Sequence, residues 1–188
     1  MSSNLKLSPH SRKAHSILAL ALIVGASHRS TADDAIRLVV PYVKQPEALC
    51  GGAAATMVFK YWGDEKADVR QFVPLVDRKA GGIATDVLAK AIEDRAWRVV
   101  RFTGSLDSLA DRLRARQPVI VLLEDRPHKY HYVVAIGLTA GHIVLHDPAR
   151  GPSRLVRLAK FRRSWEAAAS WALLVLPADP ILTPTPEL

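Results

Sequence analysis

The chain contains one cysteine, Cys50, where the sequence changes from a polar, proline-containing stretch to an apolar run. Gly51 and Gly52 follow it, and the residues from Ala53 to Trp62 are almost all apolar and recur at helical spacing. This pattern predicts a buried helix that begins at the cysteine and ends at Gly63. The dipole and free N–H groups of a helix N-terminus favour negative charge, so a cysteine there ionises more easily, and the thiolate is the nucleophilic form.

A lone cysteine also has a structural interpretation, because free thiols are often small buried members of a protein core. The glycines after the cysteine favour chemistry. We interpret Gly51 and Gly52 as leaving the backbone beside the sulfur uncovered, so that a substrate carbonyl can approach the first N–H groups. Thr56 and Lys60 are the strongly polar residues of the run, and we expect them to form one narrow solvated stripe on the helix.

A thiol nucleophile needs a base, and the base needs an orienting group. His131 opens an apolar, β-branched segment, and Asp147 ends the next one, directly before Pro148. If a three-residue loop, Thr139-Ala140-Gly141, joins these segments, His131 and Asp147 are diagonal neighbours on one face of a hairpin. A two-residue loop would place them on opposite faces. We expect the three-residue loop, because Gly141 suits the left-handed position of such loops.

The elements that must position these residues form two groups along the chain. We expect helices first, with Thr85 as an N-cap and Val87 facing inward, and a run of strands afterwards. This order indicates an α+β fold in which an N-terminal helical part packs on an antiparallel sheet. The expected helices are 68–76, 85–95, 105–116 and 161–169; the expected extended or strand segments are 36–42, 97–102, 119–123, 131–138, 142–147, 154–158 and 171–176.

The first 32 residues have the pattern of a secretory signal peptide. Basic residues precede a short apolar run at 17–24, and small residues follow it, with candidate cleavage sites after Ala26 and Ala32. The run is short for a transmembrane helix, although an uncleaved N-terminal membrane anchor is the alternative. We therefore expect an exported protein, periplasmic or extracellular, with one domain at 33–177 and a disordered, proline-rich tail at 178–188.

The net charge does not call for nucleic acid as a partner. The formal charge is +8, but residues 1–32 contain four basic and no acidic residues, which leaves 22 basic against 18 acidic residues. No aromatic platform accompanies the basic clusters, so we expect no nucleic-acid binding. A single cysteine excludes an internal disulfide and a cysteine-rich metal site. His142 and His146 could bind a metal only weakly, so we expect neither metal nor cofactor. Because strand side chains alternate, we expect His146 to lie on the opposite face of the sheet to His131.

Taken together, these residues resemble the C39 cysteine peptidases, which are papain-like domains that remove double-glycine leader peptides from bacteriocins and related secreted peptides. The resemblance spans about residues 39–176. It rests on Gln45, on Cys50-Gly51 leading a helix to Tyr61-x-Gly63, on His131-Tyr132-Val133-Val134, and on Asp147-Pro148.

The resemblance implies a papain-like fold, a role for each site residue and a peptide or protein substrate. Cys50 would be the nucleophile, His131 the general base and then the acid, and Asp147 the orienting residue. Gln45 would form the oxyanion hole with the backbone N–H of Cys50. Four residues separate Gln45 from Cys50, one fewer than is usual in papain-like enzymes.

The leader peptidases of this family work on the cytosolic side as parts of ATP-driven exporters. This sequence shows no ATP-binding or transporter segment, so we expect a stand-alone, exported C39-like peptidase whose membrane association, if any, runs through the N-terminal segment. Its substrates would be leader peptides or other exported peptides. Two alternatives stay open: a peptide-binding domain of the same fold that does not cut, and an acyltransferase or amidase that uses the same cysteine.

Overall fold

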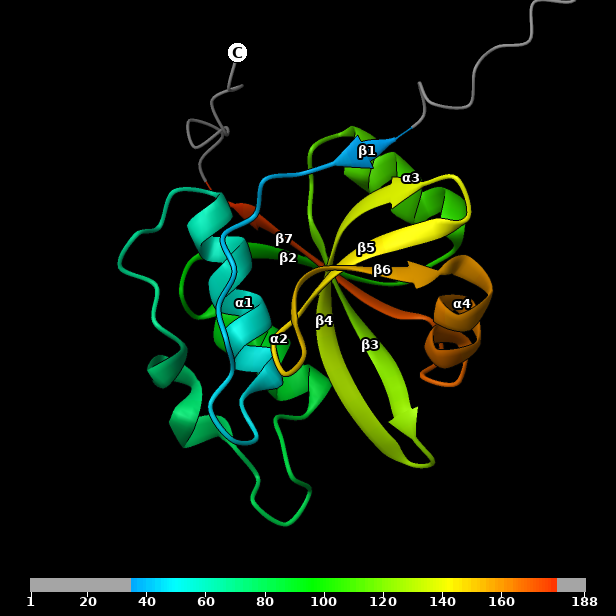
Figure 1. Cartoon of the computed structure of the whole chain (residues 1–188). Coiled ribbons are helices and arrows are strands. Elements are labelled where there is room, and N and C mark those ends of the chain that lie inside the picture. The colour runs from blue at the N-terminus through cyan, green and yellow to red at the C-terminus, as the bar shows by residue number, and fades with distance from the viewer. Residues whose placement is uncertain (1–34, 179–188) are drawn as a thin grey trace, which may run out of the picture. The chain divides into compact units, whose positions relative to one another are not determined.

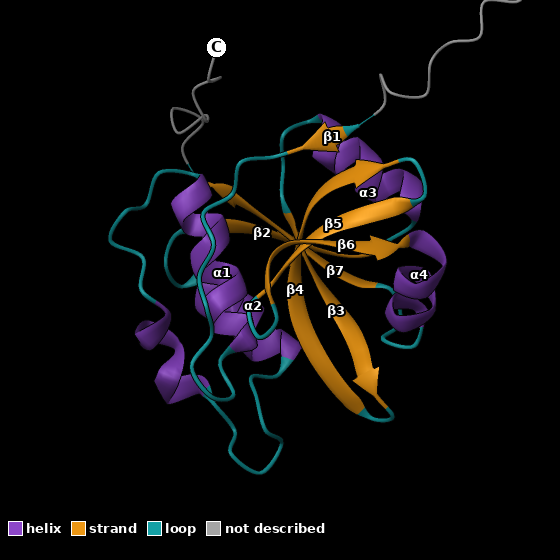
Figure 2. Cartoon of the chain, in the orientation of Figure 1, coloured by secondary structure: helices purple, strands orange, loops and turns teal. Residues whose placement is uncertain are grey.

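The structure, a computed structural model, describes residues 35–178. The predicted signal peptide lies outside these residues, as does the predicted tail after its first residue. The fold is α+β: seven antiparallel strands form one twisted sheet, with α1 and α2 to one side of it and α4 to the other (Figure 1, Figure 2). Among the described residues, no helix is both long and apolar enough to cross a membrane.

The strand order is β2-β7-β3-β4-β5-β6, and β1 pairs with β4 beyond the part that pairs with β3. The helices are α1 (Cys50–Tyr61), η2 (Val69–Leu75, a 3-10 helix), α2 (Thr85–Glu93), α3 (Leu106–Arg114) and α4 (Leu158–Glu166). The strands are β1 (Ile36–Arg37), β2 (Trp97–Thr103), β3 (Val119–Arg126), β4 (Lys129–Thr139), β5 (His142–Asp147), β6 (Gly151–Arg157) and β7 (Trp171–Pro177).

The helix predicted from the cysteine is confirmed as α1, and it begins at Cys50. Gly63 adopts a φ of +95° just after the helix, which suits its predicted role in ending it. The solvated stripe was wrong for Thr56. Its side chain is buried, and its Oγ1 donates a hydrogen bond of 2.8 Å to the carbonyl of Gly52, so the hydroxyl is satisfied without water.

The two glycines after the cysteine are needed for packing, which corrects the interpretation that they leave the backbone uncovered. A Cβ on Gly51 would lie 3.1 Å from the ring of Tyr132, and one on Gly52 would lie 2.7 Å from the Cβ of Phe72. Both glycines are buried. The first turn of α1 is therefore packed closely against β4 and η2, and this fixes the position of Cys50.

The remaining helices follow the predicted pattern with local differences. Thr85 is the first residue of α2 rather than its N-cap, which is Ala84 and makes no side-chain capping bond. Val87 is exposed rather than inward, because the buried stripe of α2 is centred on Leu88 and Ile92. The start of α3 is capped by Ser105.

The hairpin of β4 and β5 reaches the predicted register by a different route. Its loop has two residues, because Thr139 pairs with His142, so the expected three-residue loop was wrong. A β-bulge between Ala135 and Gly137 then adds one residue to β4, so that Ala135 pairs with Leu145. The shorter loop alone would place His131 and Asp147 on opposite faces of the sheet. The extra residue in the bulge reverses this, so both side chains lie on the same face.

The N-terminal strand closes onto this bulge. The predicted segment at 36–42 is a strand only at Ile36–Arg37, and Leu38 donates a backbone hydrogen bond of 2.7 Å to the carbonyl of Ile136 in the bulge. A Cβ on Gly137 would lie 2.3 Å from the carbonyl oxygen of Ile36. Glycine is therefore required at position 137 for the lead-in segment to approach β4.

Candidate active site

Cys50 is the first residue of α1, and the first turn of this helix contains no acidic side chain. Its thiol is free and largely buried. Burial by itself raises the pKa of a thiol, but hydrogen bonds to the thiolate from His131 and from backbone groups of Tyr132 and Gly51 outweigh it, so the pKa of Cys50 is lowered. The thiol is therefore placed to ionise, and His131 contributes more to this than the start of the helix does.

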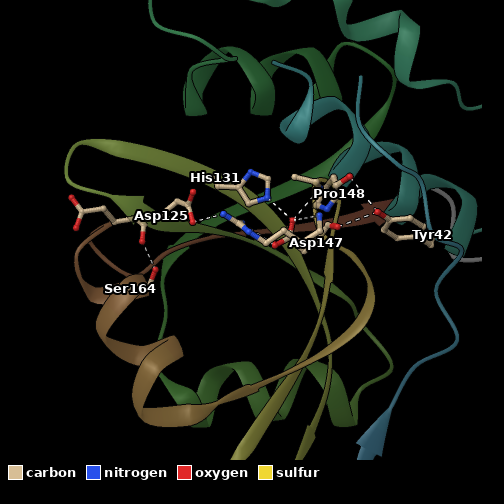
Figure 3. Close-up of polar contacts among 9 residues, drawn as sticks. Tyr42, Asp125, His131, Asp147, Pro148 and Ser164 are labelled. Carbon is tan, nitrogen blue, oxygen red and sulfur yellow. Dashed lines mark hydrogen bonds and ion pairs between the residues drawn. The ribbon is translucent and has the colours of Figure 1, made fainter. Parts of the chain in front are cut away.

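His131 links the cysteine to Asp147. Its Nε2 lies 2.7 Å from Oδ1 of Asp147, and the two side chains are 12% and 8% exposed (Figure 3). Because Asp147 occupies Nε2, Nδ1 is the nitrogen that serves Cys50. Burial lowers the pKa of a histidine, but the bonds to Asp147 and Cys50 more than reverse this and raise the pKa of His131 to about 9. The imidazole is therefore held in its protonated form near neutral pH.

The carboxylate of Asp147 is fixed by the turn that follows it. Its Oδ1 accepts hydrogen bonds from the backbone N–H groups of Ala149 at 3.0 Å and Arg150 at 3.1 Å, and Oδ2 accepts one from Nη1 of Arg150 at 3.0 Å (Figure 3). Burial would raise the pKa of this carboxyl group, but the bonds to His131 and Arg150 hold it well below its usual range. Asp147 is therefore a fixed anion that is hydrogen-bonded to the imidazole.

The segment that carries Gln45 is tied to the same turn. The hydroxyl of Tyr42 donates to the carbonyls of Asp147 at 3.1 Å and Pro148 at 3.2 Å, and the backbone N–H of Gln45 donates to the carbonyl of Pro148 at 3.0 Å. Gln45 lines a groove together with Cys50 and His131. Its Oε1 is buried and has no hydrogen-bond partner within residues 35–178. The structure thus brings all four predicted site residues to one place.

His146 has a structural role on the other face of β5, as its strand position predicted. Its Nε2 donates to the carbonyl of Val40 at 2.8 Å, and its Nδ1 accepts from the backbone N–H of Ser153 at 3.0 Å. Both nitrogens are engaged, so this buried histidine is neutral and holds the lead-in segment against the sheet. Within the described part of the chain, no group of three or more His, Cys, Asp or Glu side chains could hold a metal ion.

Cys50 lies between two hollows that meet at its side chain. The Gln45-side groove, of about 750 Å³, is lined by Gln45, Glu47, Val73, Arg78, Asp125 and Arg126. The Tyr132-side groove, of about 510 Å³, is lined by Asp77, Ile83, Ala84, Leu122, His128 and Tyr132. Gly81, Lys129 and Tyr130 belong to both. An extended chain can therefore cross the thiol with residues on either side of it.

The structure adds residues that the sequence reasoning did not single out. Arg150 and Tyr42 contact the Asp147 turn, and Asp125 binds Arg150 from β3. The Asp-Pro-Ala-Arg order is a local signal for an aspartate-capped turn, and it could have pointed to Arg150. Tyr42 and Asp125 carry no such signal, because they reach the turn from distant parts of the chain.

This arrangement can perform nucleophilic acyl chemistry. It contains a thiol at a helix N-terminus, an imidazole bonded to a fixed carboxylate, and an open groove on both sides of the sulfur. The backbone N–H of Cys50 and the amide of Gln45 are the groups available to a developing oxyanion.

Comparison with known proteins agrees with this description. A family model described as the Peptidase_C39 like family matches residues 37–173. A comparison with curated proteins finds no match to the sequence.

Solved structures share the fold, at sequence identities that support the fold alone. A Bacillus anthracis protein described as a C39-like peptidase is 19% identical with a TM-score of 0.65, and the match covers 76% of this chain and 97% of that one. The peptidase domain of Streptococcus ComA, a bifunctional ABC transporter, is 18% identical with a TM-score of 0.64, covering 74% and 99%. A double-glycine-motif protease from an AMS/PCAT transporter, bound to a leader peptide, is 23% identical with a TM-score of 0.60, covering 75% and 94%.

Proposed function

Because the chain belongs to the Peptidase_C39 like family, we propose that it is a cysteine peptidase that hydrolyses peptide bonds through Cys50, His131 and Asp147. The family and the papain-like fold support a peptidase or a leader-peptide-binding role. The observation that carries the enzymatic proposal is the 2.7 Å bond between His131 and Asp147, together with a lowered pKa at Cys50. A domain that only binds peptides has no need of a thiolate.

In the proposed reaction, the thiolate of Cys50 forms a bond to the scissile carbonyl carbon, and the carbonyl π electrons move to the oxygen. The oxyanion accepts hydrogen bonds from the Cys50 N–H and from Gln45. His131 gives its proton to the leaving amine as the C–N bond breaks, which leaves a thioester on Cys50. His131 then takes a proton from water, the hydroxide attacks the thioester, and the acid product leaves as the thiolate returns.

Peptides or proteins outside the cytoplasm are the proposed substrates, leader peptides among them. The open grooves on both sides of Cys50 suit an extended chain, and one structural neighbour was solved with a leader peptide. Export rests on the N-terminal pattern alone. N-terminal sequencing of secreted protein should begin after Ala26 or Ala32, whereas an intact Met1 on soluble cytosolic protein would contradict it.

The first experiment measures how fast iodoacetamide alkylates Cys50 as a function of pH. The wild-type protein should react well below about pH 8.5, where an ordinary thiol ionises, because the thiolate is paired with an imidazolium. His131→Ala should shift the reaction to the pH of an ordinary thiol. His142→Ala is the matched control, since His142 lies at the far end of the hairpin, and it should leave the profile unchanged.

A wild-type profile like that of an ordinary thiol would contradict the enzymatic proposal and favour the peptide-binding alternative. If Cys50 is reactive, digestion of a peptide library separates the remaining two cases. Cleavage supports the peptidase. Acyl transfer to added amines without hydrolysis would replace it by an acyltransferase.

A further inference from the structure

A chain of charged side chains continues from His131 and Asp147 to the end of β3. Arg150 donates from Nη1 to Oδ2 of Asp147 at 3.0 Å, and from Nη2 to Oδ1 of Asp125 (Figure 3). The two arms of one guanidinium therefore bridge two carboxylates that are 22 residues apart in the chain. With the thiolate of Cys50 and the imidazolium of His131, the charges alternate in sign along the whole series.

Asp125 reaches this position through an irregularity in β3. Glu124 pairs with Tyr130 and Arg126 pairs with Lys129, so Asp125 is the extra residue of a β-bulge and has no cross-strand partner on β4. Bulges of this kind commonly redirect a side chain beside an active site. Here the bulge frees Asp125 to bind Arg150.

The Arg150 side chain is the partner of the second oxygen of Asp147. His131 and the backbone N–H groups of Ala149 and Arg150 all bond to Oδ1, and among the described residues only Nη1 of Arg150 bonds to Oδ2. Asp147 is 8% exposed, so little water can replace this bond. Without it, the carboxyl group can turn away from His131 or take up a proton.

An arginine on the surface does not hold such a position unaided. Arg150 is 41% exposed, and a single exposed ion pair contributes little because both side chains lose freedom to form it. A guanidinium fixed by two carboxylates on its two arms is better defined.

From these contacts we infer that Arg150 is a positioning residue for the His131–Asp147 pair, and that Asp125 holds Arg150 in place. The inference rests on the proposed function, since it concerns the same thiolate–imidazolium pair. It extends the hydrogen-bonded series beyond Asp147 to Arg150 and to Asp125 in the β3 bulge.

The test compares Arg150→Gln with the control Arg154→Gln. Arg154 lines the same small cavity as Arg150 but makes no ion pair within residues 35–178. In Arg150→Gln, the onset of Cys50 alkylation by iodoacetamide should move up by about one pH unit or more, because a misplaced or protonated Asp147 no longer supports the imidazolium. On a cleaved peptide, kcat should fall by about tenfold or more with little change in KM.

The charge-conserving variant Arg150→Lys separates positioning from a simple charge effect. Loss of a positive charge by itself disfavours the Cys50 thiolate and would also move the onset of alkylation to higher pH, but a pure charge effect would leave Arg150→Lys like wild type. Arg150→Lys keeps the charge but cannot bridge both carboxylates, so it should fall between wild type and Arg150→Gln. A wild-type profile for Arg150→Gln, or a wild-type profile for Arg150→Lys, would overturn the inference.

Asp125→Asn gives an independent test, because Asp125 acts through Arg150. The double variant Asp125→Asn/Arg150→Gln should have the same alkylation profile as Arg150→Gln alone. Additive shifts, or no shift in Asp125→Asn, would overturn the role of Asp125. If wild-type Cys50 itself reacts like an ordinary thiol, the proposed function fails; if wild type is reactive and Arg150→Gln equally so, only the positioning role fails.

Discussion

At the scale of the residue, the candidate site is defined by the protonation states of Cys50 and His131. The pKa of His131 is raised to about 9 and the pKa of Cys50 is lowered, so folding favours the thiolate–imidazolium form of the pair. In the unfolded chain between about pH 6.5 and 8.5, the imidazole is neutral and the thiol is protonated. A folded thiolate–imidazolium pair binds the same number of protons, so wherever the pair takes this form it gives the free energy of unfolding no pH dependence in this range.

Replacing Cys50 by serine should expose the titration of His131. The pKa of His131 stays raised in this variant because the bond between His131 and Asp147 remains. Protonated His131 therefore contributes fully to the free energy of unfolding below about pH 6.5, the pKa of an unfolded histidine. This contribution is lost as the pH rises through the pKa of His131 in the folded protein. The free energy of unfolding of Cys50→Ser, from urea denaturation, should therefore fall just above pH 6.5 by up to about 1.4 kcal/mol per pH unit. Cys50→Ser/His131→Gln should lack this slope; an equal slope in wild type would contradict the ion pair.

Gln45 can be tested separately from the pair, because it contributes through the oxyanion. Gln45→Ala should lower kcat by about 10²-fold with little change in KM, as expected for loss of one oxyanion donor. The pH profile of Cys50 alkylation should stay as in wild type, since alkylation forms no oxyanion. A normal kcat in Gln45→Ala would remove Gln45 from the proposed mechanism.

At the scale of the element, the β4 bulge decides whether the site can form. The two-residue loop alone would turn His131 and Asp147 to opposite faces, and the extra residue between Ala135 and Gly137 turns them back. The same bulge receives the lead-in segment, which continues past Val40 and Tyr42 to Gln45. The register that brings His131 and Asp147 together and the position of Gln45 therefore both depend on the β4 bulge.

Gly137→Ala tests this dependence. The new Cβ would lie 2.3 Å from the carbonyl oxygen of Ile36, so the lead-in segment must move away from β4. We expect the free energy of unfolding to fall by about 1–3 kcal/mol in urea denaturation. Gly82→Ala is the control, because a Cβ there meets nothing within 4 Å and should have little effect. Equal stability of the two variants would contradict the role of Gly137.

At the scale of the whole molecule, the grooves on both sides of Cys50 are formed between the helical part and the β3–β4 hairpin. The hairpin lines both grooves with Lys129 and Tyr130, and the loop around Gly81 lines them from the other side. Tyr130 is 50% exposed, so its ring is available to a bound chain. Its place beside the thiol suggests that it contacts the substrate.

Tyr130→Ser should therefore weaken substrate binding without changing the chemical step. Loss of one aromatic contact should raise KM about fivefold or more with kcat nearly unchanged. Val100→Ser is the control, because Val100 is also exposed but lies on β2, away from both grooves. A fall in kcat at constant KM would mean that Tyr130 supports the catalytic pair instead.

The local features of this protein follow from short stretches of its sequence. A thiol before an apolar helical run, β-branched segments at strand spacing and an Asp-Pro turn each depend on neighbouring residues. These gave α1, most of the strands, the α+β class and the residues Cys50, His131 and Asp147, whereas Gln45 came only from the resemblance to the C39 peptidases. The roles of these four residues stay predictions until they are tested.

How these parts meet depends on contacts between segments that are far apart in the chain. The loop prediction was wrong, but the predicted register is still reached, because a bulge a few residues before the loop compensates for the missing loop residue. No local sequence pattern at Ala135–Gly137 predicts this bulge. Gly51 and Gly52 were interpreted as an open backbone but are closely packed by Tyr132 and Phe72, which come from other elements. The contact of Asp125 with Arg150 was likewise not predictable, since the β3 bulge must first place Asp125 beside the turn that follows Asp147. Close packing between distant segments, rather than residue type, fixes these features.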